Sequence, residues 1–451
     1  MDSIIDTIMD NILDNMAAVG QFGRMKKPDA HDVEIAVVGA GPGGLAAALA
    51  LAAAGFDVTV LDRASGAENP GKQKAPTAPD PRATALSPSS LAMLTRLDVI
   101  RRMNPAPHPV AAMEIADGHP DIGFLADNLS LHNARDVAND VKAVAHIVMN
   151  EPLKQALTEA AQAHPHIRLA APVDVTGVDK SDKTAGLRLE TSAGIMRCHL
   201  LVACDGRQSP LRHAMKIRSL DHAYGQRALV TTFRHTRPHD DIARQFFRPA
   251  GPLACLPLAG NTSALVWVEA ADYAQALASA PLSHITAELA HRLDGVLGEI
   301  ELTAPPIHYP LSLMLAESYT APHFALMGEA AHVIHPLAGQ GYNLTLRDAA
   351  CLAETLYRAR HLGLDIGSLP ALQPYARQRR ADAYAMAATT HGLNKLFSRP
   401  SGIASLVRQI GIGLAGRRLG LTGQAVRQAD TGLAASGNLP RLLRGEAFND
   451  G

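Results

Sequence analysis

Three things that are scarce in this chain each exclude a class of protein. Among 451 residues only four are cysteine, and they lie far apart, mostly in apolar runs. Neither a disulfide framework nor a zinc cluster is therefore expected, and a reducing cytosol is the default compartment. No run of about 18 uncharged apolar residues occurs, so no membrane span is predicted. The formal net charge of -1 argues against a general nucleic-acid binder. We expect no metal site and no nucleic-acid partner.

The remaining composition is that of a soluble globular protein. Apolar residues make up 47% and charged residues 19% of the chain, and the length predicts two joined domains because one core rarely supports so many residues. Between residues 4 and 16, apolar side chains recur at helical spacing with aspartates between them. A secretory signal would be basic and then uniformly apolar. This segment is either a helix that docks on a partner or lipid surface, or a frayed or wrongly assigned start ahead of Met25.

The first pattern with chemical meaning covers residues 33–62. An apolar run typical of a buried strand leads into Gly39-Ala-Gly-Pro-Gly-Gly44, followed by an Ala/Leu helix to about residue 54 and a second strand that ends at Asp62. This order of strand, glycine turn, helix, strand and acid predicts dinucleotide binding. The alternative is a glycine-rich turn in an unrelated α/β unit.

Each residue of that pattern has a physical reason. Gly39 permits the tight turn, Gly41 lets the backbone approach a pyrophosphate, and Gly44 lets the helix pack on the strand. Asp62 can accept hydrogen bonds from the hydroxyls of an adenosine ribose. Arg63, the next residue, is also expected to contact the cofactor.

Two later segments allow two interpretations each. A helix is predicted over residues 82–97, and Arg82 is either a solvent-facing charge near its start or a contact close to a phosphate. A strand over 198–203 runs into Asp205-Gly206, which is usually only a turn signal. With Arg212 at the start of a following helix, this loop can instead face a cofactor.

A third stretch, residues 324–348, predicts a site for negative charge. A short apolar strand is followed by a loop containing Pro336, Gly339 and Gly341, and a helix is predicted from about Tyr342 to residue 356. A loop that delivers backbone N–H groups into a helix N-terminus can hold an anion.

Composition also changes along the chain. Between residues 226 and 270 short strands alternate with turns, and a helix follows over about 283–293. This predicts an antiparallel substrate sheet inserted into a nucleotide-binding domain. The expected division is an N-terminal extension (1–30), a discontinuous nucleotide-binding domain (31–105, 149–215 and 309–395), a substrate domain (106–148 and 216–308) and a helical tail (396–451).

Together these motifs resemble the FAD-dependent aromatic hydroxylases of the para-hydroxybenzoate hydroxylase fold, and more narrowly the ubiquinone-biosynthesis hydroxylases. The resemblance covers about residues 33–399. Its most specific string is His335-Pro-Leu-Ala-Gly-Gln-Gly341, followed by Asn343-Leu and Arg347-Asp. It implies a mixed α/β fold, with a Rossmann-like FAD-binding domain, an inserted antiparallel-sheet substrate domain and a helical C-terminal tail.

The resemblance also assigns expected roles to residues. The three glycines would bind the FAD pyrophosphate, Arg82 would lie near the pyrophosphate or ribityl chain, and Asp205 would lie in a loop serving FAD and NAD(P)H. Glu329 would contact the ribityl hydroxyls, although many relatives have Asp there, and Thr345 stands where Gly is common. The cofactor-binding residues expected from the third stretch are Gly328, Glu329, Gly339, Gly341, Tyr342 and Asn343.

The implied chemistry asks little of protein side chains. FAD would be reduced by NADH or NADPH and O2 would supply the oxygen atom, while Pro336, Gly339, Gln340 and Gly341 position the flavin and their backbone N–H groups stabilise its negative charge. No certain acid or base is identified. His332 and His335 are candidates for proton transfer, but a histidine beside a buried loop more often satisfies backbone groups.

The composition of the predicted helical tail, residues 396–451, bears on where the protein lies in the cell. Residues 396–451 contain seven arginines but only three acidic residues. Apolar residues lie between the arginines, as in a helix lying on an anionic bilayer. A helix that covers the FAD domain is the alternative. The expected protein is an FAD monooxygenase that hydroxylates a polyprenylated phenolic ring in ubiquinone biosynthesis. It would lie on the cytoplasmic side of the inner membrane, with a ubiquinone-biosynthesis complex as a further partner.

Two other functions stay open at this point. A non-oxygenating FAD reductase or dehydrogenase acting on an isoprenoid lipid would have the same fold. So would a catalytically silent assembly factor, for which Glu329 is the only hint.

Overall fold

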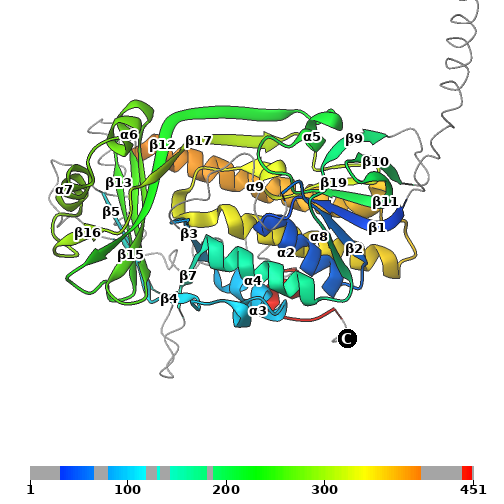
Figure 1. Cartoon of the computed structure of the whole chain (residues 1–451), viewed down its shortest axis with the longest axis horizontal. Coiled ribbons are helices and arrows are strands. Elements are labelled where there is room, and N and C mark those ends of the chain that lie inside the picture. Colours follow the sequence, from blue (N-terminus) through cyan, green and yellow to red (C-terminus); the bar gives the residue numbers. More distant parts are fainter. Residues whose placement is uncertain are drawn as a thin grey trace, which may run out of the picture.

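The computed structural model describes residues 31–64, 80–117, 129–132, 143–179, 186–397 and 439–448. Within them the chain forms two large sheets side by side (Figure 1), and a small third sheet contacts a strand of the second sheet and helices that pack beside the first. The expected N-terminal extension and residues 398–438 of the expected tail lie outside the described residues.

The first large sheet is mostly parallel and has the order β18-β19-β11-β1-β2-β8. Residues Ile35, Ala36 and Val37 of its central strand are fully buried, as expected for a parallel strand covered on both faces. The strands predicted from apolar runs near residues 33–38, 56–61 and 198–203 are confirmed. The strands are β1 (His31–Val38), β2 (Val58–Leu61), β8 (Ile167–Ala170), β9 (Val175–Asp179), β10 (Leu187–Thr191), β11 (Gly194–Ala203), β18 (Thr320–Ala321) and β19 (Phe324–Leu326).

Helices cover this sheet, and the most buried of them follows the first glycine turn. Every residue of α2 (Pro42–Ala53) from position 44 to position 52 is buried. A helix that is apolar on all sides must be surrounded, and α2 packs between α8 (Gln340–His361) and α4 (Asn150–Ala163). Small alanine side chains allow this close approach. On its other side α8 contacts α9 (Leu369–Phe397).

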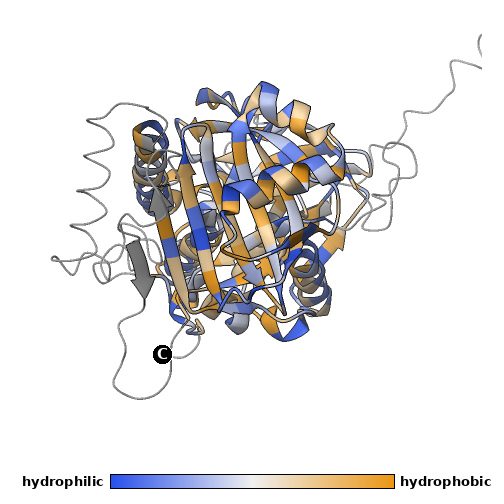
Figure 2. Ribbon diagram, turned by 90° about the vertical axis from the view of Figure 1, so that its left-hand side faces the viewer, coloured by the Kyte–Doolittle hydropathy of each residue, from blue (hydrophilic) through white to orange (hydrophobic). Residues whose placement is uncertain are grey.

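The second large sheet is mainly antiparallel, with the order β20-β17-β12-β15-β14-β13-β5-β6. Hydrophilic and hydrophobic residues are interleaved along its strands (Figure 2), as expected for a sheet with differently covered faces. Its core holds Trp267, Phe233 and Leu289, and helices α6 (Ala271–Ala278) and α7 (Leu282–Leu293) follow its strands. The strands are β5 (Ala112–Asp117), β6 (Leu129–His132), β12 (Ser219–His235), β13 (Ile242–Arg248), β14 (Gly251–Leu258), β15 (Thr262–Ala270), β16 (Ile300–Leu302), β17 (Ile307–Ala316) and β20 (His332–Val333).

The third sheet corrects one prediction. It contains β3 (Ala83–Leu86), β7 (Ala145–Met149) and β4 (His108–Val110), whereas a helix was expected from residue 82. Pairing with β7 makes residues 83–86 a strand, and α3 (Pro88–Arg96) begins only after Ser87, whose hydroxyl accepts from the N–H of Ser90. Tertiary pairing overrides the local helix preference here.

The sheets also bear on the expected division of the chain. Strand β17 pairs with β12 in the antiparallel sheet, so residues 309–316 belong to that sheet rather than to the parallel one. The division into domains itself stays a prediction. Among the described residues, no helix has the length and apolar character needed to span a membrane.

Candidate active site

Four parallel strands end at the same edge of the first sheet. Val38, at the end of β1, lies opposite Leu61 of β2 on one side and Ala203 of β11 on the other, and Ala203 lies opposite Leu326 of β19. The chain order reverses around β1, which is where open α/β sheets bind ligands, beyond the carboxyl ends of their strands. The three stretches predicted to bind a cofactor therefore meet at one crevice.

The first loop has the close contacts that require glycine. Gly39 has φ +107°, and a Cβ on it would lie 2.4 Å from the carbonyl oxygen of Cys204. A Cβ on Gly44 would lie 1.8 Å from the carbonyl oxygen of Gly39. A Cβ on Gly41, by contrast, would have no described atom within 4 Å. The backbone there is open to a ligand, at the N-terminus of α2, which favours an anion.

Asp62 lies beside this loop, as predicted. Its carboxylate accepts hydrogen bonds from the N–H of Ala40 at 2.5 Å and from the N–H of Ala64 at 2.7 Å. These bonds fix the acid at the end of β2 next to the glycine turn. Arg63 is exposed and follows it on the same edge.

The second loop holds a buried acid with spare hydrogen-bonding capacity. One oxygen of Asp205 accepts from the N–H of Leu211 at 3.1 Å, while Oδ1 is buried and has no hydrogen-bond partner among the described residues. Burial raises the pKa of Asp205 above its ordinary value. An unpartnered buried acceptor is costly, and a hydroxyl or N–H group of a bound cofactor would satisfy it.

Arg212 was a candidate to face a cofactor, but its side chain binds backbone groups of the protein instead. It is buried, and its guanidinium donates to the carbonyl oxygens of Ala330 at 2.9 Å and Arg207 at 2.9 Å. It therefore ties the second loop to the turn after β19 rather than facing a ligand with its charge.

That turn carries Gly328 and Glu329 in the short helix η2 (Gly328–Ala330). Gly328 has φ +60°, and Glu329 is exposed beside Arg82. The pKa of Arg82 is raised mainly because its guanidinium donates to Asp80, with further contributions from Tyr309 and Glu329, which lie close to it. The structure thus places Glu329 near Arg82, whose ion pair is with Asp80 at 2.6 Å.

Thr345, the residue found where relatives commonly have Gly, lies between the cofactor loops. Its methyl group would be 2.9 Å from a Cβ on Gly43 and 3.0 Å from one on Gly328, and its hydroxyl donates to the carbonyl oxygen of Gly341 at 3.3 Å. The side chain fills the space that the two glycines leave open.

The third loop ends in η3 (Leu337–Gly339) and α8. Gly339, the N-cap residue of α8, has φ +62°, and no described side chain caps the helix. Gln340 adds a buried Oε1 without a hydrogen-bond partner in the described part of the chain. The first N–H groups of α8 are therefore available to negative charge on a ligand.

Two residues expected to bind the cofactor use their side chains inside the protein. Asn343 is fully buried, accepts from the N–H of Ser87 at 3.0 Å and donates to the carbonyl oxygen of Ala85 at 2.8 Å. The hydroxyl of Tyr342 donates to the carbonyl oxygen of Pro42 at 3.2 Å. Both side chains join α8 to other parts of the site, so any cofactor contact of Asn343 falls to its backbone.

A buried charge network supports the turn and the helix from behind. The carboxylate of Asp348 accepts from the N–H of Gly328 at 3.0 Å, from His332 at 2.6 Å and from Arg379 at 2.7 Å. Burial alone would raise the pKa of Asp348, but His332 and Arg379 outweigh it and hold the pKa below its ordinary value. His332 therefore has a structural role.

His335 differs from His332. It is fully buried, its Nε2 donates to Oε1 of Gln226 at 3.3 Å, and its Nδ1 has no partner among the described residues. Burial lowers the pKa of His335 to about 4, with a smaller contribution from His391. This histidine is neutral at pH 7 and stands directly before Pro336.

Pro336 and Gly339 form one wall of an apolar cavity of about 100 Å³. Its other walls come from all three strands of the small sheet and from the antiparallel sheet, with Arg244, Gln245 and Tyr309 as the polar groups. Sequence reasoning missed these residues, because small apolar side chains in separate strands carry no motif. The apolar lining residues are Ala83, Ala85, Val110, Met113, Ala145, Ile147, Ala243, Pro252, Ala254, Leu256, Val266 and Val268.

Comparison with known proteins identifies the family of the chain. The family model described as an FAD binding domain matches residues 32–388. The chain is 35% identical over 413 residues to the ubiquinone hydroxylase UbiL of Rhodospirillum rubrum, covering 91% of this chain and 92% of the relative. It is 32% identical over 400 residues to the 3-demethoxyubiquinol 3-hydroxylase of Escherichia coli, covering 88% of this chain and 98% of the relative.

Solved structures show the same fold. The p-nitrophenol 4-monooxygenase PnpA of Pseudomonas putida superposes with a TM-score of 0.68 at 21% identity, covering 88% of this chain and 97% of that one. The chain belongs to the FAD-binding monooxygenases, in the ubiquinone-biosynthesis hydroxylase family. The expectations of a mixed α/β flavoprotein fold, of FAD as cofactor and of NAD(P)H as electron donor are confirmed.

Proposed function

We propose that this enzyme hydroxylates the phenolic ring of a polyprenylated precursor of ubiquinone. The apolar cavity beside Pro336 and Gly339 carries the proposal, since it adjoins the loop that would hold the flavin ring. An aromatic ring suits a cavity lined by small aliphatic side chains and few polar groups. The names of the relatives support ubiquinone biosynthesis as the pathway.

The residues at the crevice fit the cofactor. Gly39, Gly41 and Gly44 would hold its pyrophosphate at the N-terminus of α2, and Asp62 its adenosine ribose. Asp205 Oδ1 and Gln340 Oε1 are buried acceptors without partners in the described chain, as a site shaped for a polar ligand requires. When bound, FAD takes electrons from NAD(P)H and uses O2 to supply one oxygen atom to the ring, the other leaving as water.

The chain's own groups orient and shield this reaction. Backbone N–H groups at the start of α8 would face the negative charge that reduction creates, with the positive end of the helix behind them. Pro336 and the aliphatic walls would exclude water from the ring. Arg244 is held at the cavity wall by Glu114, at 3.1 Å, and by the carbonyl oxygen of His239, at 3.1 Å.

We further propose that the enzyme works at the inner membrane surface, with the arginine-rich residues 396–451 as its contact and other ubiquinone-biosynthesis proteins as partners. A polyprenyl tail cannot be delivered through water, so the substrate must come from a bilayer or a protein that has extracted it.

Deletion of the gene in its host, followed by mass analysis of the accumulated quinone precursor, tests this function. The expected precursor lacks one ring oxygen, and reintroduction of the wild-type gene restores ubiquinone. Unchanged ubiquinone, or a precursor that differs in its isoprenoid tail, would contradict the proposal.

A further inference from the structure

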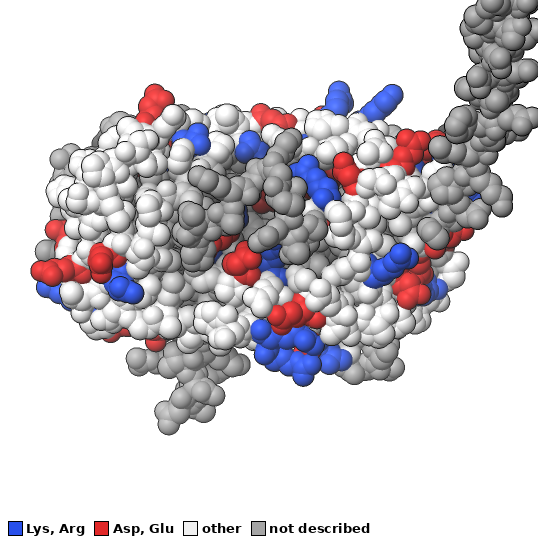
Figure 3. Space-filling model, in the orientation of Figure 1, with Lys and Arg blue, Asp and Glu red and all other residues white. Residues whose placement is uncertain are grey.

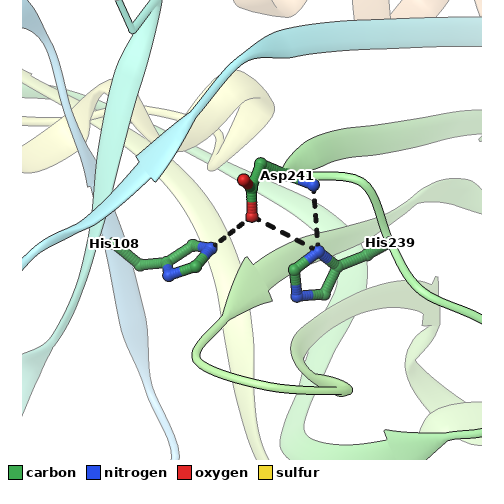
Figure 4. A group of neighbouring side chains, drawn as sticks. All are labelled: His108, His239 and Asp241. Carbon is green, nitrogen blue, oxygen red and sulfur yellow. Dashed lines mark hydrogen bonds and ion pairs between the residues drawn. The ribbon is translucent and has the colours of Figure 1, made fainter.

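A second cluster of ligand-type side chains lies away from the flavin crevice, where the small sheet meets the antiparallel sheet. His108 begins β4, while His239 and Asp241 lie in the turn before β13, and the three side chains point toward one another (Figure 4). The N–H of Ala111 donates to the carbonyl oxygen of Asp241 at 2.8 Å, so the two segments are also joined through the backbone.

The distances within the cluster suit one metal ion. His108 Nε2 lies 2.8 Å and His239 Nδ1 lies 3.7 Å from Oδ1 of Asp241, and the three ligand atoms are within 4.8 Å of one another. Two ligands of a tetrahedral zinc ion, each about 2.1 Å from it, are about 3.4 Å apart. The two short distances bracket that value, so small side-chain rotations would place one ion in contact with all three.

The tautomer of His239 is already the one a metal needs. Its Nε2 donates to the carbonyl oxygen of Leu258 at 2.8 Å, and its Nδ1 accepts from the N–H of Asp241 at 3.0 Å. Nδ1 therefore carries the lone pair, and a ring rotation that breaks its bond from the N–H of Asp241 would direct this lone pair to an ion between the ring and the carboxylate, which lies 3.7 Å away. A ring held through its other nitrogen by a backbone carbonyl is the usual second contact of a metal-bound histidine.

The backbone and the charges also favour a cation. Asp240 and Asp241 both have φ +55°, a conformation that costs energy for a residue other than Gly. Arg244, which reaches the carbonyl oxygen of His239, is paired with Glu114 rather than with Asp241. The carboxylate of Asp241 therefore has no arginine or lysine partner among the described residues. Asp241 is 48% exposed, so water can reach the remaining coordination position.

We propose that His108, His239 and Asp241 bind a divalent transition metal of the zinc class. Two imidazoles and one carboxylate form a ligand set that such ions accept, with water completing the coordination. Val110 and Ala243, two residues from the ligands on each strand, line the substrate cavity. The ion would link the two cavity walls formed by β4 and β13 and stabilise their relative position. The expectation of no metal site rested on the cysteines and did not consider this cluster.

The chain offers a matched comparison site. His199, His323 and Asp365 also form a close group. Asp365 Oδ1 accepts both from His199 Nε2 at 2.5 Å and from the N–H of Gly367 at 2.8 Å, whereas among the described residues Asp241 Oδ1 accepts from His108 Nε2 alone, at 2.8 Å. His199 and Asp365 are 42% and 45% exposed. Asp365→Asn therefore reports background binding by surface histidines and carboxylates.

Zinc titration of the full-length, FAD-loaded enzyme by calorimetry, after treatment with a chelator, tests the proposal. We expect one zinc ion per chain in the wild type and in the Asp365→Asn variant, and at least tenfold weaker binding in Asp241→Asn and in His239→Gln. No binding in the wild type, or loss of binding in Asp365→Asn with retention in Asp241→Asn, would overturn it.

X-ray absorption at the zinc edge of the wild type needs no variant and so does not depend on how the variants fold. Two imidazole ligands with a carboxylate and water are expected. A shell containing sulfur, or one of oxygen alone, would place the ion elsewhere and contradict the assignment.

Discussion

Gly41 and Gly44 lie in the same loop, but a side chain should affect the protein differently at each position. Measurements of FAD content and thermal stability distinguish the two effects. Gly41 has an extended backbone, φ -69°, and a Cβ added to it would meet no described atom, so Gly41→Val should fold normally. Its side chain would occupy the position of the pyrophosphate, and we expect loss of FAD from the purified protein with little change in thermal stability. The flavin-to-protein ratio and circular dichroism melting measure the two effects.

Gly44→Ala is the contrasting variant. Its Cβ would lie 1.8 Å from the carbonyl oxygen of Gly39, so the turn must shift and stability should fall together with FAD content. Equal flavin content in wild type and Gly41→Val would contradict the assignment of this loop to the cofactor.

His335 predicts a dependence of stability on pH. The pKa of His335 is about 4 in the folded protein and about 6.5 in an unfolded chain. Between these values the unfolded state binds more protons, so stability falls as pH decreases from about 6.5 toward about 4. The loss attributable to this histidine between pH 7 and pH 5 is about 2 kcal/mol. The groups nearest the ring are Tyr224, Gln226 and His391.

The His335→Gln variant should lack this component. Urea unfolding of both proteins at pH 7 and pH 5 measures it, with exposed His284→Gln as the control. The same change in unfolding free energy for wild type and His335→Gln would show that His335 takes up its proton as readily when folded as when unfolded.

Among the elements, the turn after β19 depends on helices that follow it in the chain. Asp348 of α8 and Arg379 of α9 meet His332 and Gly328 in a fully buried network. Asp348→Asn would remove one of the two acidic partners of the buried guanidinium of Arg379 and leave it with Asp382, which also pairs with Arg347. We expect a loss of about 3–5 kcal/mol in unfolding free energy, together with weaker FAD retention.

A surface ion pair gives the control. Arg218 and Glu317 are 83% and 51% exposed, so Glu317→Gln should cost only about 0–1 kcal/mol. Similar losses for the two variants, measured by denaturant unfolding, would mean that the buried network contributes no more than a surface pair.

Sequence patterns predict the elements of the parallel sheet well and those of the cavity poorly. Apolar runs bounded by glycine identify β1, β2 and β11 because strands covered on both faces are continuously apolar. The segment 83–86 was wrongly expected to be helical, because its pairing with β7 depends on residues sixty or more positions away, which a local pattern does not reveal. Likewise Asn343 and Arg212 are charged or polar at suitable positions, but only the fold shows that their side chains bind backbone groups of the protein itself.

At the scale of the whole molecule, charge is mixed rather than concentrated. Figure 3 shows acidic and basic side chains interspersed over one face, with basic ones gathered at its lower edge, in keeping with the net charge of -1. Attraction to an anionic bilayer must then come from a local segment of the chain. We propose the segment that contains the arginines between residues 399 and 427. These residues lie outside the part of the chain that the structure describes.

Replacement of Arg399, Arg408, Arg417, Arg418 and Arg427 by Gln tests this segment. Each arginine near an anionic surface contributes about 1 kcal/mol, so co-sedimentation with vesicles containing anionic phospholipid should weaken at least tenfold, and added salt should weaken the wild type similarly. The double variant Arg218→Gln, Arg234→Gln serves as the control. Unchanged sedimentation would favour a tail that covers the FAD domain.

The central claim is that the chain transfers one oxygen atom from O2 to a polyprenylated phenolic ring. The purified FAD-loaded enzyme, given NADH or NADPH and the precursor extracted from the deletion strain under isotopically labelled O2, measures this directly by mass spectrometry. The account predicts a product that carries one labelled oxygen atom on its ring. Consumption of NAD(P)H with a product that is reduced or dehydrogenated and carries no label would contradict it.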